Sequence, residues 1–368
     1  MMKRILFLTP FCPSRIAGGH NYTRLLLKKL ADEGYLVDLL YCKYSKDPFY
    51  ENPDTTRIQI LRVCKINTFV KFLNAIKVPI LHPIFTIRFS WLVLFFLKWM
   101  DFKKNYDLVY LDHPQMYIYG LFFKQKKVLM AHDVMAQRYD RASSRFVQKI
   151  VKIGERFFMS MKNCVVFSFS EKDQLLVKKY YGISSEKTNF FIDSQIRCLP
   201  PPSIQNYFVF FGKWDRDDNL DGMKWFFNEV YPKINARIKI IGSAMPREYQ
   251  IELKKKPFVE YLGFIDNPYD VIANAKAVLA PLFTGAGVKV KVIESLACGT
   301  PVVGNDISFE GISNEWNDFM LAVNSAKEFV CAMQKINMDK DERTQFRTNF
   351  LRKYDSQSFI NYLRRINV

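Results

Sequence analysis

Short hydrophobic runs alternate with longer amphipathic stretches along most of the chain. The pattern starts with a hydrophobic run at 4–9, a glycine-containing loop at 17–20 and an apolar helical stripe over 21–33. A second hydrophobic run at 35–42 completes a strand–helix–strand opening. Strands that alternate with helices are typical of parallel sheets covered on both faces, so the predicted fold class is α/β.

The same rhythm runs through two halves of the chain. We predict further strands at 107–112, 127–133, 164–170, 206–212, 236–242, 259–264, 277–282 and 300–305, and helices at 220–230, 267–275, 289–298 and 355–366. Between the halves, Leu199 is followed by three prolines, which cannot continue a helix or a central strand. We therefore expect two doubly wound, Rossmann-like domains that face each other across a cleft, 1–199 and 203–353. A C-terminal helix, 354–368, is expected to pack back on the first.

Composition supports a globular protein of two domains. The chain has 368 residues, of which 49% are hydrophobic and 24% charged, and this excludes disorder. Seven scattered cysteines without a CxxC pair indicate reduced thiols in a cytosolic protein, and only four histidines are present. We expect neither a metal ion nor a cofactor. The apolar run that leads into Pro10 is too short for a signal peptide and is interpreted as the first strand.

The charge is concentrated in the first half. Residues 1–200 carry 32 basic and 16 acidic side chains, whereas 201–368 carry 22 and 20. The segment 55–104 contains nine basic residues and a single acidic one, Asp101, and it includes the aromatic stretch 85–100. The longest uncharged run of this stretch, Phe89–Leu97, is too short to span a bilayer. This favours a segment at an anionic membrane surface, with a buried core helix as the alternative and a nucleic-acid partner as the weaker candidate.

The most specific segment is PLFTGAGVKVKVIESLACGTPVV at 281–303. Gly285 and Gly287 lie between a predicted strand and a predicted helix, where free backbone N–H groups suit a diphosphate. Glu294 lies further along the helix, where it could accept hydrogen bonds from a ribose. The alternatives are a tight turn at the glycines and an ion pair between Glu294 and Lys291.

This segment resembles the donor-site motif of the family 4-like glycosyltransferases of the GT-B fold, also described as glycosyl transferases group 1. The opening with Pro10, Gly18 and Gly19 and the stretch FGKWDRDDNLDGMKWFFNEVYP at 211–232 are similar to other parts of that family. The resemblance implies a retaining glycosyltransferase that uses a nucleotide diphosphate sugar.

The resemblance also assigns roles to residues. It implies that His132 approaches the donor sugar, that Lys213 binds the diphosphate and that Glu294 holds the ribose; these three are the predicted catalytic residues. The donor-binding set that it implies comprises Gly18, Gly19, Gly212, Lys213, Gly285, Gly287, Val288, Lys289, Lys291 and Glu294.

Two positions depart from the family pattern. Ala286 replaces the first glutamate of the E-x7-E motif, and Asn219 stands where the family often has a second lysine on the phosphates. Lys289 and Lys291 are the two candidates to replace that charge.

The resulting hypothesis is an enzyme, specifically a hexosyltransferase, for cell-surface polysaccharide or glycolipid assembly. We expect it to work in the cytoplasm, peripheral to the inner face of the membrane, on a lipid-linked saccharide acceptor and without nucleic acid. The alternative is a catalytically inactive nucleotide-sugar-binding protein of the same fold. A nicotinamide-dependent oxidoreductase is less compatible, because the first loop lacks G-x-G-x-x-G.

Overall fold

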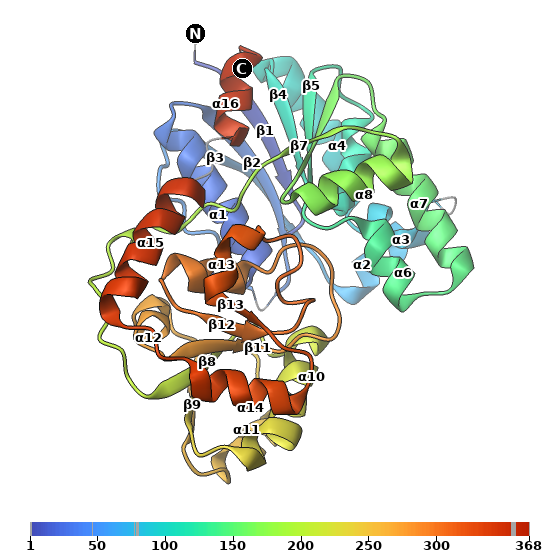
Figure 1. The fold of residues 1–368 in the computed structure, drawn as a ribbon. Coiled ribbons are helices and arrows are strands. Elements are labelled where there is room, and N and C mark those ends of the chain that lie inside the picture. Colours follow the sequence, from blue (N-terminus) through green and yellow to red (C-terminus); the bar gives the residue numbers. More distant parts are fainter. Residues whose placement is uncertain (1, 46, 77, 79–80, 355–357, 368) are drawn as a thin grey trace. The chain divides into compact units, whose positions relative to one another are not determined.

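The protein is described by a computed structural model that covers residues 2–45, 47–76, 78, 81–354 and 358–367. It forms two compact units (Figure 1). The first comprises Met1–Ser14, Gly19–Asn189 and Ser356–Val368, and the second comprises Arg15–Gly18 and Phe190–Asp355. The chain passes between the units ahead of the proline run at 200–202, which lies in the sequence of the second unit.

The first unit is built on a parallel sheet with the strand order β3-β2-β1-β4-β5-β6-β7 within the described residues. The strands are β1 (Arg4–Thr9), β2 (Leu36–Lys43), β3 (Ile58–Lys65), β4 (Leu108–Asp112), β5 (Lys126–Ala131), β6 (Cys164–Ser168) and β7 (Ser185–Lys187). Its helices are α1 (Gly18–Asp32), α2 (Thr68–Ile76), α3 (Pro83–Thr86), α4 (Trp91–Lys104), α5 (Pro114–Gly120), α6 (Met135–Ala142), α7 (Arg145–Met159), α8 (Glu171–Tyr181) and α16 (Ser358–Arg365).

The second unit holds a parallel sheet with the order β10-β9-β8-β11-β12-β13 in the part of the chain that is described. Its strands are β8 (Tyr207–Phe211), β9 (Arg237–Ile241), β10 (Val259–Gly263), β11 (Ala277–Ala280), β12 (Val302–Gly304) and β13 (Met320–Ala322). Its α-helices are α9 (Ser194–Arg197), α10 (Asp217–Trp225), α11 (Arg247–Lys254), α12 (Tyr269–Ala273), α13 (Val290–Ala297), α14 (Ala326–Lys335) and α15 (Lys340–Tyr354). The predicted α/β class with parallel sheets is confirmed.

Burial explains why the hydrophobic runs become strands. Ile5–Leu8 of β1 and Leu108–Leu111 of β4 are completely buried, as expected for central strands covered on both faces. The C-terminal helix α16 belongs to the first unit, where Phe359 packs against Tyr110 and Phe167 of the sheet.

Some predicted elements differ from the structure. The predicted helix 220–230 starts too late, because α10 begins at Asp217; after α10 ends at Trp225, a π-helix over Phe226–Val230 continues to the predicted end. The predicted strand 127–133 is too long, because pairing with β6 stops at Ala131 and Ser168. Strand β3 was not predicted, because exposed polar and basic residues interrupt its hydrophobic run. Strands β7 and β13 are only three residues long and leave no clear pattern.

Helix α4 combines the two alternatives considered for the stretch 85–100. One side packs into the core of the first unit through four buried side chains, Val93, Leu94, Leu97 and Met100. The other side carries five apolar residues whose exposed fractions lie between 47% and 89%, Trp91, Leu92, Phe95, Trp99 and Phe102. The helix is therefore anchored in the core and still presents an apolar surface.

Candidate active site

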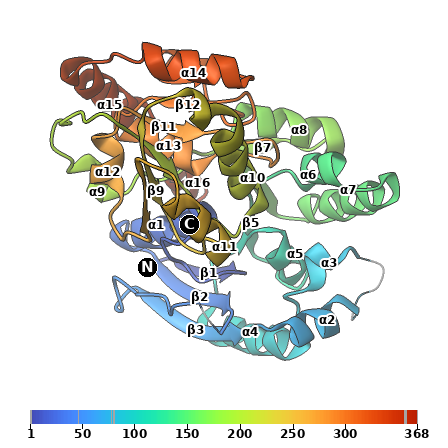
Figure 2. The same cartoon turned by 90° about the horizontal axis from the view of Figure 1, so that it is seen from below.

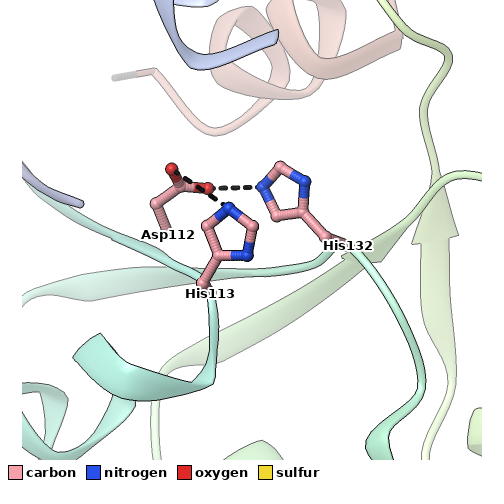
Figure 3. Close-up of side chains that lie close together, drawn as sticks. All are labelled: Asp112, His113 and His132. Atoms are coloured by element: carbon pink, nitrogen blue, oxygen red, sulfur yellow. Dashed lines mark hydrogen bonds and ion pairs between the residues drawn. The ribbon is translucent and has the colours of Figure 1, made fainter. Parts of the chain in front are cut away.

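In the first unit, polar side chains gather where two neighbouring strands end. Asp112 is the last residue of β4, His113 follows it, and His132 comes directly after β5. Because β4 and β5 are paired and parallel, their carboxyl ends lie at the same edge of the sheet, where ligands bind in such folds. Figure 3 shows the three side chains turned toward one another.

Asp112 and His132 form a short buried pair. His132 Nε2 lies 2.6 Å from Asp112 Oδ1, and the carboxylate is completely buried. The other oxygen, Oδ2, accepts hydrogen bonds from the hydroxyl groups of Thr9 (2.8 Å) and Thr23 (2.7 Å). Burial raises the pKa of Asp112, but the charges of His113 and His132 and the hydrogen bonds outweigh it and lower the pKa to about 2. Asp112 is therefore a carboxylate at neutral pH.

The ionised carboxylate fixes the protonation of the neutral imidazole. A carboxylate only accepts hydrogen bonds, so His132 Nε2 must carry the proton and Nδ1 is left as an acceptor. Nδ1 faces the start of α1, since a Cβ placed on Gly19 would lie 3.7 Å from it. The absence of a side chain at Gly19 keeps this approach to the imidazole open.

His113 completes the cluster. Its ring stacks on that of His132 with 3.6 Å between the centroids, and burial lowers the pKa of His113 well below its ordinary value. Ligand atoms of Asp112, His113 and His132 lie within 4.8 Å of one another, a separation compatible with a shared metal ion. Parallel stacked rings, however, do not direct two nitrogen lone pairs at one point, so this arrangement fits a metal poorly.

In the second unit, Asn219 connects the predicted phosphate-binding residues. Gly212 and Lys213 follow β8, and Asn219 lies on α10. The side-chain amide of Asn219 donates to the carbonyl of Lys213 (2.9 Å) and accepts from Lys291 Nζ at 2.8 Å. A Cβ at Gly212 would lie 3.1 Å from the amide nitrogen of Asn219, so the glycine permits this close packing.

The two candidate lysines point to different partners. Lys291 Nζ reaches Asn219, whereas Lys289 Nζ donates to the carbonyls of Ala286 (3.2 Å) and Gly287 (2.7 Å). Burial lowers the pKa of Lys291 to about 8, although the nearby Asp218 acts in the opposite direction. Lys213 forms an ion pair with Asp215 at 3.1 Å. Of the two candidates, Lys291 is therefore the lysine whose ammonium group contacts the side chain at position 219.

The glycine loop before α13 requires its glycines. Gly285 and Gly287 have φ angles of 112° and 67°, which L side chains rarely adopt. A Cβ at Gly285 would lie 3.6 Å from Lys289 Cε and 3.8 Å from Asp218 Oδ2, so the loop adjoins the start of α10. Val288 packs against the core behind the loop.

Glu294 is held by an aromatic partner. Its Oε1 accepts a hydrogen bond from the Tyr269 hydroxyl at 3.0 Å, and its side chain is buried. Burial, together with the charge of Glu294, raises the pKa of Tyr269. Within the described residues, the alternative ion pair between Glu294 and Lys291 does not form, because Lys291 reaches Asn219 instead.

Known proteins resemble this chain in family and in fold. Residues 205–339 match the family Glycosyl transferases group 1. A sucrose-phosphate synthase from Thermosynechococcus elongatus superposes with a TM-score of 0.72 at 17% identity, over 96% of this chain and 95% of that one. This chain has the GT-B fold, and its residues 205–339 match a glycosyltransferase family.

Two further comparisons concern nearly the whole chain. An uncharacterized 44.6 kDa protein from the cps region of Klebsiella pneumoniae is 23% identical over 371 residues, with 92% of each chain covered. HepE from Anabaena, in a complex with UDP and glucose, superposes with a TM-score of 0.62 at 14% identity, with 96% of each chain covered.

The structure places the predicted residues in separate groups. In the second unit, the residues that contact Asn219 are Gly212, Lys213 and Lys291. Gly285 adjoins Lys289 and Asp218, Lys289 contacts the carbonyl of Gly287, and Glu294 lies with Tyr269. Gly19 lies beside the histidines of the first unit, whereas Gly18 groups with the second unit. Sequence reasoning missed Asp112 and His113. The signal was available, since both stand at the carboxyl end of a predicted strand, where α/β enzymes bind ligands.

Proposed function

We propose that the protein transfers a hexose from a nucleotide diphosphate sugar to an acceptor hydroxyl during assembly of a cell-surface polysaccharide or glycolipid. The observation that carries the proposal is the contact of Lys291 with Asn219 beside the glycine loop. It returns a cation to the position where the family often has a phosphate-binding lysine. The UDP complex of HepE and the cps-region relative support the same donor class and setting.

In this proposal the second unit holds the leaving group. Lys291 and Lys213 offset the charge of the diphosphate, and the backbone N–H groups near Gly287 add hydrogen bonds, so no metal is required. Glu294, which the Tyr269 hydroxyl holds in place, accepts hydrogen bonds from the ribose. The main electrostatic task is to stabilise the diphosphate as its bond to the sugar breaks.

The first unit acts on the sugar. His132 presents its Nδ1 acceptor to a sugar hydroxyl, while Asp112 holds the ring in place. The bond between the anomeric carbon and the diphosphate oxygen breaks, and the acceptor oxygen forms a bond to the same carbon. Its proton passes to the departing phosphate oxygen, and the configuration is retained.

Radioactive transfer with a panel of nucleotide sugars tests the proposal. We expect one donor to give a glycosylated product, or slow release of free sugar when no acceptor is present. Nucleotide binding without either reaction would instead support the inactive nucleotide-sugar-binding alternative. No binding to any nucleotide diphosphate would overturn the donor assignment.

We also propose that the enzyme works at the inner face of an anionic membrane on a lipid-linked saccharide. The exposed apolar side of α4 carries Lys98 and Lys103, and α2 exposes Phe69, Phe72 and Ile76. Figure 2 shows α4 and α2 along the same border of the first unit. Exposed aromatic residues interleaved with lysines suit the headgroup region. Within the described residues, the helices lack the combination of length and apolarity needed to cross a bilayer.

A lipid surface fits this patch better than a second copy of the chain. Protein interface cores are depleted in lysine, and two copies that each carry a formal charge of +18 repel each other. Anionic lipid, in contrast, attracts the lysines and accepts the apolar side chains between them.

A further inference from the structure

Two cations converge on one phenol at the carboxyl end of β2. Arg88 Nη2 donates to the hydroxyl of Tyr44 at 3.0 Å, and Lys71 Nζ lies 4.6 Å from the centre of the Tyr44 ring. Tyr44 follows β2, Lys71 lies on α2, and Arg88 lies between α3 and α4. Burial raises the pKa of Tyr44, but hydrogen bonds and charges from Lys71 and Arg88 outweigh it, so the pKa falls below its ordinary value.

Neither cation has a carboxylate partner within the described residues. Arg88 is only 5% exposed, and its Nε and Nη1 atoms form no hydrogen bond there. The nearby carboxylate of Asp47 accepts instead from the backbone N–H of Tyr44 at 2.7 Å. A buried guanidinium without a counter-charge is costly, and an anion bound next to it lowers that cost. Tyr44 and Lys71 are only partly buried, so an anion can reach them from solvent. The buried guanidinium of Arg88 then adds positive charge on the protein side of Tyr44.

This group adjoins the histidine cluster. Arg88 Cζ lies 5.9 Å from the ring centre of Phe11, and that ring contacts His113 edge-on with 5.2 Å between the centroids. The first residues after β1 therefore connect the cations to the proposed sugar site. On the other side, the helix that carries Lys71 exposes Phe69 and Phe72, which belong to the proposed membrane surface.

We propose that Arg88, Tyr44 and Lys71 form a binding site for a phosphate group of the acceptor. The inference rests on the proposed function and narrows it to acceptors that carry phosphate. The phosphate binds at the Tyr44 hydroxyl and the Lys71 ammonium, and the saccharide attached to it extends along Phe11 toward His132. A lipid-linked diphosphate and a water-soluble sugar phosphate share this chemistry. The site includes Lys71 of α2, and the exposed Phe69 and Phe72 of that helix favour the lipid.

Equilibrium dialysis with farnesyl diphosphate, farnesol and inorganic pyrophosphate tests this site. We compare the full-length protein with Lys71→Met, Tyr44→Phe and Arg88→Met, and use Lys149→Met as the control, since Lys149 is an exposed lysine of α7 in the same unit. Loss of a hydrogen bond to a charged group weakens binding about ten- to a hundredfold. We expect this loss for farnesyl diphosphate with Lys71→Met and Arg88→Met, a smaller one with Tyr44→Phe, and none with the control.

The three probes separate the sources of the phosphate. Farnesol binding should not respond to Lys71→Met, because it carries no phosphate. Binding of pyrophosphate that is sensitive to Lys71→Met, without binding of farnesyl diphosphate, would support the site but assign it to a soluble acceptor. Equal affinity of the parent and Lys71→Met for both phosphate probes would overturn the inference. Lys71→Met keeps the inference testable if Arg88→Met fails to fold.

A parallel titration with UDP distinguishes this inference from the proposed function. If UDP binds and sugar transfer proceeds but both phosphate probes fail to bind, only the acceptor site is wrong. If the phosphate probes bind in the expected manner but no nucleotide does, the donor assignment is wrong and the anion site remains.

Discussion

His132 Nε2 lies 2.6 Å from the carboxylate of Asp112, which is itself held by the hydroxyls of Thr9 and Thr23. This relationship links three parallel strands and one helix at a single edge of the first sheet. It fixes both the direction of the imidazole and the nitrogen that carries the proton. A group oriented in this way suits contact with a reacting sugar more than general packing.

We predict that His132→Ala lowers sugar transfer far more than nucleotide binding. The imidazole is proposed to contact the sugar, so its loss should appear in kcat, with the affinity for UDP unchanged. Asp112→Asn should also lower kcat, because the amide can donate to Nε2 and favour the other tautomer. Steady-state kinetics and UDP titration measure the two effects. Full turnover by His132→Ala with the true donor would make the histidine structural.

A second prediction concerns the diphosphate. Lys291→Met and Glu294→Ala should each weaken UDP binding about ten- to a hundredfold, the expected cost of a charge-assisted hydrogen bond. Lys213→Ala should also weaken it, but less, because Asp215 already pairs with the ammonium. Isothermal titration gives the affinities, and Lys254→Met, which removes an exposed lysine of α11, is the control. Unchanged titrations for Lys291→Met and Glu294→Ala would contradict the donor site.

The pair at positions 219 and 291 permits a charge-swap test. Asn219→Lys alone should weaken both folding stability and UDP affinity, since it places a second ammonium against Lys291. The double variant Asn219→Lys/Lys291→Asn should recover UDP affinity by moving the cation to the position that the family often uses. Thermal unfolding and titration of the three proteins measure the coupling. Additive losses in the double variant would show that the two positions do not share one charge.

The pKa of Lys291 leads to a pH dependence. With a pKa of about 8, the ammonium is protonated below pH 8 and loses its charge above it, so UDP affinity should fall between pH 7 and pH 9. Arg remains protonated over this range, so Lys291→Arg should remove the decline. Titrations across the pH range test this point. The same decline in Lys291→Arg as in the parent would assign it to another group.

For the membrane, we predict co-sedimentation with anionic liposomes, weaker binding to neutral ones and partial release at high salt. Each cation near an anionic surface contributes about 1 kcal/mol, and apolar burial adds binding that resists salt. Changing Trp91, Phe95 and Trp99 together to serine should remove this salt-resistant part without unfolding the chain, because their side chains are exposed.

The matched control for this experiment changes Ile251 and Phe264 to serine, two comparably exposed apolar residues of the second unit. Equal losses in the control and in the α4 variant would indicate a non-specific effect. Absence of parent binding to anionic liposomes would remove the membrane proposal.

The sequence by itself determined the fold class, the GT-B resemblance and much of the proposed donor site. A strand that is buried on both faces needs apolar side chains along its whole length. Such hydrophobic runs can therefore be recognised in the sequence without knowing which strands lie next to them. The sequence also marks the loop at Gly285 and Gly287 as a place where glycine is needed. Their positive φ angles agree with this, since other residues rarely adopt them. Edge strand β3 was missed because only part of its length is buried.

Only the tertiary structure decided which side chains meet. Lys291 and Asn219 are 72 residues apart, and Asp112 and His132 are 20 apart, so no local pattern could select Lys291 over Lys289 or join Asp112 to its histidine. The two sides of α4 likewise became distinct only when one of them packed against the sheet. The hydrophobic pattern of a segment indicates which of its residues are buried within that helix or strand. Strand order and helix packing decide which residues from different elements come together at one edge of the sheet.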